Sequence, residues 1–220
     1  MIHKITQEQL REITALPVQG ITSSDRDEMA IPSYLHGNPL IRWLMVKRYE
    51  CIAQLAGFSA NDNVLEFGCG IGVFLPTLCA DCGTVYAIDL FPQYAKALVE
   101  KLDLRVTFPD SLTEVTDHSL DYVIAADVLE HFTDPDSIIA LMRQKLKQTG
   151  KLVISGPTEN PVYKAGRIIA GFADKGDYHH TNINELISRI ANAGFRLRAT
   201  RTLPFRFPPF LFKIALLCVD

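Results

Sequence analysis

The feature that most constrains the fold is a run of three glycines at alternate positions, in the motif EFGCGIG at residues 66–72. It directly follows a short apolar run at 63–67 that is typical of a buried strand, and it opens a segment with apolar residues at helical spacing. Glycine lets the backbone turn sharply and lets a ligand lie against the main chain. The order of strand, glycine loop and helix predicts a ligand-binding loop in an open parallel sheet.

The glycine spacing disfavours a dinucleotide. A dinucleotide-binding loop places its glycines as G-x-G-x-x-G, whereas this chain has G-x-G-x-G, and Val73 occupies a position that such a loop keeps small. Glu66 lies two residues before the first glycine, where a carboxylate suits a ligand with an ammonium group better than a pyrophosphate. Spacing and charge therefore both argue against a nicotinamide-dependent dehydrogenase.

From residue 61 onward, apolar runs alternate with amphipathic segments, as a parallel sheet with crossover helices requires. The last two predicted strands are joined without a helix, so the final one must run antiparallel. We expect an α/β, Rossmann-like fold with a seven-stranded, mostly parallel sheet, helices on both faces and an antiparallel last strand. The strands are expected at 63–67, 84–89, 105–108, 120–126, 150–155, 195–202 and 210–219, and the helices at 39–55, 73–79, 92–102, 135–147 and 182–193.

A chain of 220 residues is long enough for one ordinary domain with an elaborated end. We expect residues 1–58 to form an N-terminal helical lid or cap and residues 59–220 to form the ligand-binding domain. The apolar tail from Phe207 to Val219 has two interpretations, a buried last strand or a helix resting on a membrane. Both of its faces are apolar when it is drawn as a strand, whereas Lys213 alone would make the polar face of a helix, so we favour the strand.

Composition excludes several classes of partner. Hydrophobic residues make up 48% of the chain and charged residues 21%, which is typical of a globular protein. The net charge of −3 argues against nucleic acid, which usually needs a basic surface. Five irregularly spaced cysteines indicate a reducing compartment, so we expect a cytoplasmic protein. The apolar tail is too short, and too interrupted by proline, for stable membrane insertion.

The motif E-x-G-x-G-x-G resembles the first motif of class I S-adenosylmethionine-dependent methyltransferases, and from about Tyr34 onward the later motifs of that family recur in order. The resemblance implies S-adenosylmethionine as the cofactor. It implies that Glu66, Gly68 and Gly70 hold the methionine end, that Asp89, followed by Leu90, accepts hydrogen bonds from the ribose hydroxyls, that Asp110 and Ser111 face the adenine, and that Asp127 lies near the methionine amino group.

The positions of the acidic residues agree with this resemblance. Glu66, Asp89, Asp110 and Asp127 each fall at the carboxyl end of a predicted strand, and in an open parallel sheet ligands bind beyond those ends. A single aspartate after a strand is often only a helix cap. Four of them beside a glycine loop are better explained by a common ligand.

The segment DVLEHFTDP at 127–135 is common in this broad family, where its histidine, here His131, lies at the edge of the substrate cavity. It also resembles the quinone-biosynthesis O-methyltransferases, in which two carboxylates and a histidine at this place bind a divalent metal. The first carboxylate here is Asp127, which is shorter than the glutamate of that subgroup. We therefore predict no metal.

Two further histidines, His179 and His180, precede the predicted helix at 182–193. Relatives of this type often carry a histidine at the mouth of the substrate pocket. Either one, like His131, is a candidate general base for an acceptor hydroxyl, because the ordinary pKa of histidine lies near neutrality. The alternative is that Thr181 or Asn182 caps the helix and the histidines face solvent.

The segment before the 39–55 helix provides candidates for a lid over the cofactor. In related enzymes this region closes over the cofactor carboxylate, and Tyr34 and Arg42 are the residues we assign to that role. A surface loop followed by an ordinary helix start is equally compatible with the pattern.

Together these features predict an S-adenosylmethionine-dependent methyltransferase that acts on an oxygen of a small, hydrophobic acceptor. The apolar residues of 157–181 and 203–219 favour a hydrophobic acceptor over a polar one. The alternative is a domain of the same fold that binds the cofactor or a partner without catalysis.

Overall fold

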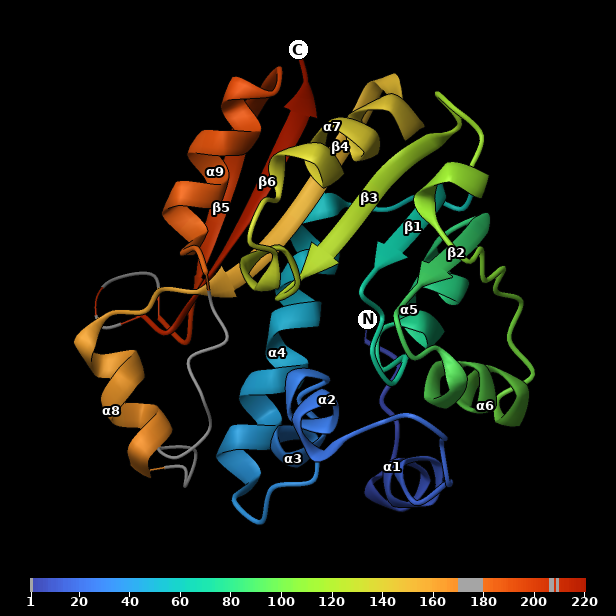
Figure 1. The fold of residues 1–220 in the computed structure, drawn as a ribbon, viewed down its shortest axis with the longest axis vertical. Helices are drawn as coiled ribbons and strands as arrows, with labels where there is room; N and C mark the ends of the chain where they lie inside the picture. The colour runs from blue at the N-terminus through green and yellow to red at the C-terminus, as the bar shows by residue number, and fades with distance from the viewer. Residues whose placement is uncertain (1, 170–179, 206–207, 209) are drawn as a thin grey trace.

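A single mixed sheet organises the molecule. The computed structural model describes residues 2–169, 180–205, 208 and 210–220. In this part of the chain six strands lie in the order β2-β1-β3-β4-β6-β5 (Figure 1). They are β1 (Asn63–Phe67), β2 (Thr84–Ile88), β3 (Leu120–Ala126), β4 (Leu146–Pro157), β5 (Phe195–Leu203) and β6 (Phe212–Val219). The pairs among β1 to β4 are parallel, and β6 is antiparallel to both β4 and β5.

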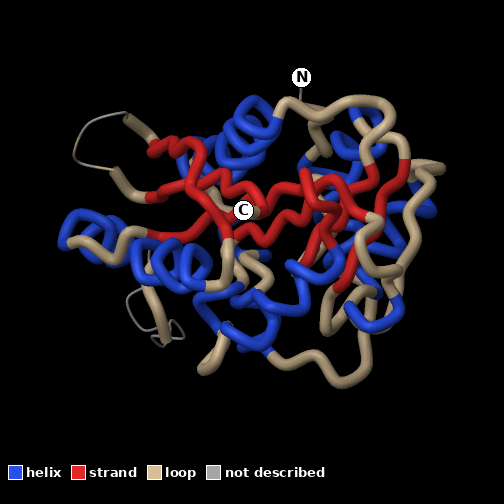
Figure 2. The backbone as a smooth tube through the Cα atoms, turned by 90° about the horizontal axis from the view of Figure 1, so that it is seen from above, coloured by secondary structure: helices blue, strands red, loops and turns tan. Residues whose placement is uncertain are grey.

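Helices cover both faces of the sheet, as Figure 2 shows from above, which confirms the predicted fold class. Before the first strand come α1 (Gln7–Thr14), α2 (Ser23–Glu28), α3 (Ile31–Tyr34) and α4 (Pro39–Ala56). Between and after the strands come α5 (Leu75–Asp81), α6 (Gln93–Lys101), α7 (Asp136–Lys145), α8 (Pro161–Ile169) and α9 (Ile183–Asn192), with short 3-10 turns η1 (Leu112–Glu114) and η2 (Leu129–His131).

The predicted count of seven strands is wrong, because the segment Arg105–Phe108 does not form a full strand. A single parallel bridge joins Thr107 to Tyr86. The backbone of Thr107 accepts a hydrogen bond from Ala87 N at 2.9 Å and donates one to Val85 O at 3.0 Å. Pro109, which has no N–H to donate, follows almost at once. The segment therefore lies beside β2 as a sheet edge that is too short to count as a strand.

The apolar tail forms a strand, as predicted. β6 lies between β4 and β5, and Ile214, Ala215 and Leu217 are fully buried there. A strand with neighbours on both sides and helices above and below has two apolar faces. Residues 207 and 209 of the predicted tail lie outside the described residues. Within the described part of the chain, no helix has the length and apolar character needed to cross a membrane.

The N-terminal region is helical, although its pattern is weak. Thr6 and Thr22 form capping boxes with Gln9 and Asp25, so α1 and α2 begin at well-defined residues. Arg26 of α2 donates to the hydroxyl of Tyr94 in α6 at 2.5 Å, which attaches this region to the sheet domain. The division of the chain at residue 58 remains a prediction.

Removing residues 207–220 tests the role of β6. Deletion leaves the edges of β4 and β5 without their ladder partner and uncovers apolar core, so we expect an insoluble product, measured as the soluble fraction after expression. Deletion of Asp220 alone, which follows β6, is the control. A truncated protein that stayed folded and soluble, and merely lost affinity for lipid vesicles, would support the membrane interpretation instead.

Candidate functional site

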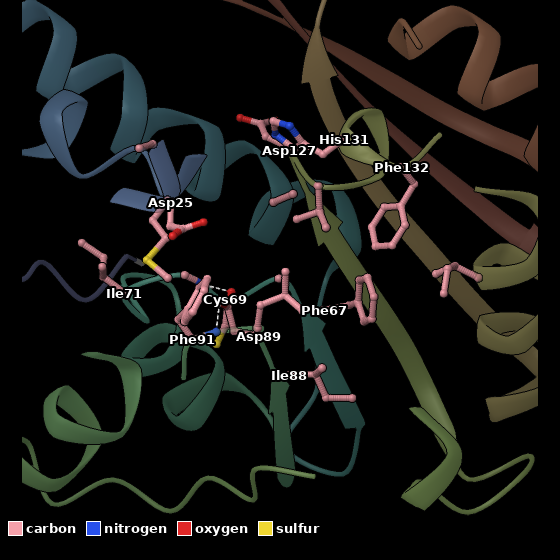
Figure 3. Close-up of a pocket in the computed structure, with 18 of the residues that line it drawn as sticks. Asp25, Phe67, Cys69, Ile71, Ile88, Asp89, Phe91, Asp127, His131 and Phe132 are labelled. Atoms are coloured by element: carbon pink, nitrogen blue, oxygen red, sulfur yellow. Dashed lines mark hydrogen bonds between the residues drawn. The ribbon is translucent and has the colours of Figure 1, made fainter. Parts of the chain in front are cut away.

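A cavity of about 510 Å³ lies beyond the carboxyl ends of β1, β2 and β3 (Figure 3). Here the chain passes from β1 to the edge strand β2 and then crosses back to β3 on the other side of β1. Such a reversal opens a crevice between neighbouring loops. The cavity is lined by loop residues 67–71, 88–91, 110–113 and 126–128, by Tyr34, Arg48, Tyr49, Val73, His131 and Phe132, by Asp25, Met29 and Ala30 of the N-terminal region, and by Ile138 and Leu141 of α7.

The glycine loop packs tightly against the loop after β3 at Gly68 but not at Gly70. Gly68 has a φ of +76°, and a Cβ atom placed there would lie 2.2 Å from Cγ2 of Val128. At Gly70, with a φ of +53°, the nearest atom to such a Cβ is the carbonyl oxygen of Met29 at 3.9 Å. Gly68 is therefore required by packing, while Gly70 leaves bare main chain beside the cavity.

Asp89 fixes the position of this loop. Its Oδ2 accepts a hydrogen bond from Gly70 N at 2.6 Å, and its Oδ1 accepts one from Phe91 N at 3.0 Å (Figure 3). Burial raises the pKa of this carboxyl despite these bonds. Carboxylate oxygens can each accept further bonds, so Asp89 can hold the loop and bind a hydroxyl at the same time. Leu90 beside it is 89% exposed at the cavity wall.

Glu66 lies behind the loop and does not line the cavity. Its side chain is buried within β1, and neither carboxyl oxygen has a hydrogen-bond partner among the described residues. Burial, with a smaller contribution from the charge of Asp89, raises the pKa of Glu66 well above its ordinary value. The predicted contact of Glu66 with the methionine end stays a prediction.

Asp110 and Ser111 also line the cavity. The backbone N–H of Asp110 donates to Glu114 Oε2 at 3.0 Å, and the Ser111 hydroxyl lies 2.6 Å from that of Thr113. These contacts, together with the bridge at Thr107, place the turn even though the preceding strand is missing. The predicted position of both residues beside the cofactor loop is therefore compatible with the geometry.

Asp127 directly follows β3 and has a left-handed conformation with a φ of +56°. Its Oδ1 accepts a hydrogen bond from the Ser155 hydroxyl at 2.6 Å, and its backbone N–H donates to Ser155 O at 3.0 Å. Its Oδ2 forms an ion pair with Arg48 of α4. The carboxylate is thus held from two sides at the cavity wall.

The sequence prediction missed Arg48. Arg48 is 3% exposed, whereas Lys47 beside it in the helix pairs with a glutamate nearer the surface. The spacing held a signal, because Arg48 lies three residues after Met45 and four before Ile52, both of which are buried.

Tyr34, predicted as a lid residue, lines the cavity, and its hydroxyl donates to that of Tyr49 at 3.1 Å. Arg42, the other predicted lid residue, donates to the carbonyl oxygens of His36 and Gly37 and is not among the lining residues. Arg42 therefore closes its own loop, and Arg48 provides the arginine that reaches the cavity.

The three candidate histidines differ in position. His131 lines the cavity next to Asp127 (Figure 3). His180 is exposed and does not line it, although its backbone N–H donates to Glu130 O at 2.8 Å. Asn182 caps α9 by accepting from the backbone of Asn184 and Glu185, as the alternative interpretation required. His179 lies outside the described residues.

The end of the cavity near His131 is apolar. The rings of Phe67 and Phe132 face each other with centroids 6.1 Å apart, and Ile138 and Leu141 of α7 continue the wall. In the described part of the chain, no group of three or more histidine, cysteine, aspartate or glutamate side chains is arranged to hold a metal ion.

Comparisons with known proteins agree with this geometry. A family model described as a methyltransferase domain matches residues 46–200. The ubiquinone biosynthesis O-methyltransferase of Xanthomonas euvesicatoria pv. vesicatoria (strain 85-10) is 32% identical over 153 residues, which cover 63% of this chain and 64% of that protein. The match thus spans slightly less than two thirds of the relative's length.

Two solved structures share the fold. One is a magnesium protoporphyrin IX methyltransferase from Synechocystis PCC 6803 with bound SAH, with 19% identity, a TM-score of 0.67 and coverage of 90% of this chain and 95% of that one. The other is the N-methyltransferase NodS from Bradyrhizobium japonicum WM9 in complex with S-adenosyl-L-homocysteine, with 19% identity, a TM-score of 0.67 and coverage of 90% and 97%. The chain belongs to the methyltransferase-domain family and has the Rossmann-like fold of class I S-adenosylmethionine-dependent methyltransferases.

Proposed function

We propose that this protein uses S-adenosylmethionine to methylate an oxygen of a small, largely apolar acceptor. The observation that carries the proposal is the cavity at the strand reversal, where bare main chain at Gly70 lies beside an anchored carboxylate, Asp89. Membership of the methyltransferase-domain family supports the same chemistry.

The residues present fit the cofactor. We assign the ribose hydroxyls to Asp89 and the adenine to Leu90, Asp110 and Ser111, all of which line the cavity. We assign the ammonium group to Asp127, which also lines it. When bound, S-adenosylmethionine supplies an electrophilic methyl group on its sulfonium.

The acceptor belongs at the apolar end, against the surface that Phe67 and Phe132 form together. Burial there removes water from the acceptor oxygen and orients it toward the methyl group, which is a large part of catalysis for a displacement of this kind. We assign removal of the hydroxyl proton to His131, the described histidine that lines the cavity. His179 and His180 remain candidates at the pocket mouth. The names of the ubiquinone biosynthesis relatives support an apolar, oxygen-bearing acceptor.

Replacement of Asp89 tests the cofactor site. Asp89→Ala removes the partner of the ribose hydroxyls from a partly buried position, so we expect the affinity for S-adenosylmethionine to fall about 10-fold or more, measured by calorimetry. Glu100→Ala on the exposed side of α6 is the control. An affinity within about a factor of two of the wild-type value would show that the ribose lies elsewhere.

Chelation tests the expected independence of metal. Arg48 already neutralises Asp127, the first carboxylate that a metal at this place would need. If the protein methylates a catechol, we therefore expect the rate to be unchanged in EDTA. Loss of activity in EDTA with recovery on addition of magnesium would contradict this.

Glu130, the neighbour of His131, makes stability depend on pH. Its carboxyl is buried, neither oxygen has a partner among the described residues, and burial raises its pKa from 4.5 to about 8. Because the unfolded chain releases this proton at lower pH than the folded protein, the contribution of Glu130 to stability is full below about pH 4.5 and is lost as the pH rises toward 8.

Glu130→Gln keeps the shape and removes the titration, so we expect its Tm to decline less than that of the wild type between pH 5 and 8. Thermal unfolding across this range measures the effect, with Glu100→Gln as an exposed control. Parallel curves for Glu130→Gln and the wild type would show that this carboxyl does not titrate differently on folding.

A further inference from the structure

Two helices at one end of the molecule expose large apolar side chains to solvent. Leu40 and Trp43 in the first turns of α4 are 64% and 47% exposed, and Val162 and Ile168 of α8 are 46% and 63% exposed. The start of α4 and the whole of α8 lie beyond the arrowheads of β3 and β4 (Figure 1). The cavity lies at this same end of the sheet. Apolar side chains grouped on exposed helices mark a surface that an apolar partner covers.

The exposed face of α4 combines an aromatic ring with a cation. Leu40, Trp43 and Lys47 follow one another at spacings of three and four residues, so they lie along one side of the helix. The opposite side is buried against the sheet, with Met45 and Ile52 in the core. A tryptophan ring has an apolar body and a polar N–H, and such rings gather at the boundary between lipid and water.

The outer face of α8 has the same character. Tyr163 fixes the inner side of this helix, because its ring packs edge to face on Phe212 of β6 with centroids 5.7 Å apart. The exposed side carries Val162, Ala165 and Ile168, together with the single cation Lys164. A helix that faces only water is polar on its outer side. An apolar outer side with a lysine is typical of a helix that rests on a lipid surface.

The charges around these side chains select the kind of surface. Residues 37–49, 160–169 and 195–219 contain lysine and arginine but no aspartate or glutamate, although the net charge of the chain is −3. The elements that carry the exposed apolar residues are therefore basic on an acidic protein. A second copy of the same face would bring like charges together, whereas the negative headgroups of a bilayer attract them.

We propose that α8 and the start of α4 rest on an anionic lipid bilayer. Leu40, Trp43, Val162 and Ile168, which we call the docking surface, enter the headgroup region, and the neighbouring lysines and arginines meet the lipid phosphates. The docking does not depend on the proposed function, but its use rests on it. With this end of the sheet facing lipid, an apolar acceptor passes between the bilayer and the cavity without crossing water.

Sedimentation with vesicles tests the docking surface. We expect the wild type to bind vesicles of equal parts phosphatidylglycerol and phosphatidylcholine, to bind phosphatidylcholine vesicles much more weakly, and to lose binding as salt is added. Leu40→Gln with Trp43→Gln, and separately Val162→Asn with Ile168→Asn, should each weaken binding to the anionic vesicles about 10-fold or more.

Leu197→Gln is the matched control. Leu197 is 43% exposed, but it lies toward the other end of β5, where it pairs with Leu217, so its replacement should not change vesicle binding. The replaced residues of the docking surface do not line the cavity, so both double variants should keep the wild-type affinity for S-adenosylmethionine by calorimetry. If one double variant does not fold, the other provides the test.

The possible failures can be told apart. The inference is overturned if the wild type does not sediment with anionic vesicles, if it binds neutral vesicles equally well, or if both double variants bind like the wild type. A dimer in light scattering that the double variants dissociate would show that a second copy covers the docking surface instead. A wild type that binds anionic vesicles but not S-adenosylmethionine would overturn the proposed function and leave the docking intact.

Discussion

The contact between Gly68 and Val128 is the constraint on which the site depends. It presses the loop after β1 against the loop after β3, and a single Cβ at Gly68 would force them apart. Because the two loops touch, Asp89, which anchors the first, and Asp127, which begins the second, lie on one cavity rather than on two separate edges. The reversal of strand order creates the crevice, and this close packing holds its two walling loops together.

Charge is distributed unevenly around that crevice. Asp89 and Asp127 keep hydrogen-bond or ion-pair partners, whereas Glu66 and Glu130 are buried without any among the described residues, and their pKa values are raised. Burial favours the protonated form of such carboxyls. The two carboxylates held by hydrogen-bond donors, Asp89 and Asp127, are thus the ones that line the cavity.

The features that could be predicted from sequence were those set by local periodicity. Alternating apolar runs located β1 to β6, and the acids at strand ends located most of the cavity wall. Features set by tertiary contacts could not be found in this way. Thr107 forms a single bridge instead of a strand because Pro109 ends the sheet edge early. Arg48 is buried because Asp127, 79 positions later in the chain, neutralises its charge. Glu66 lies next to the end of its strand, but the pleat turns its side chain into the core.

The place of β6 between β4 and β5 also dictates an order of assembly. β5 has no neighbour in the sheet except β6, which follows it in the chain. During synthesis β5 therefore leaves the ribosome before any strand exists for it to join, and β4 keeps an open edge for the same interval. Non-local pairing of this kind slows folding and leaves edges available to other chains.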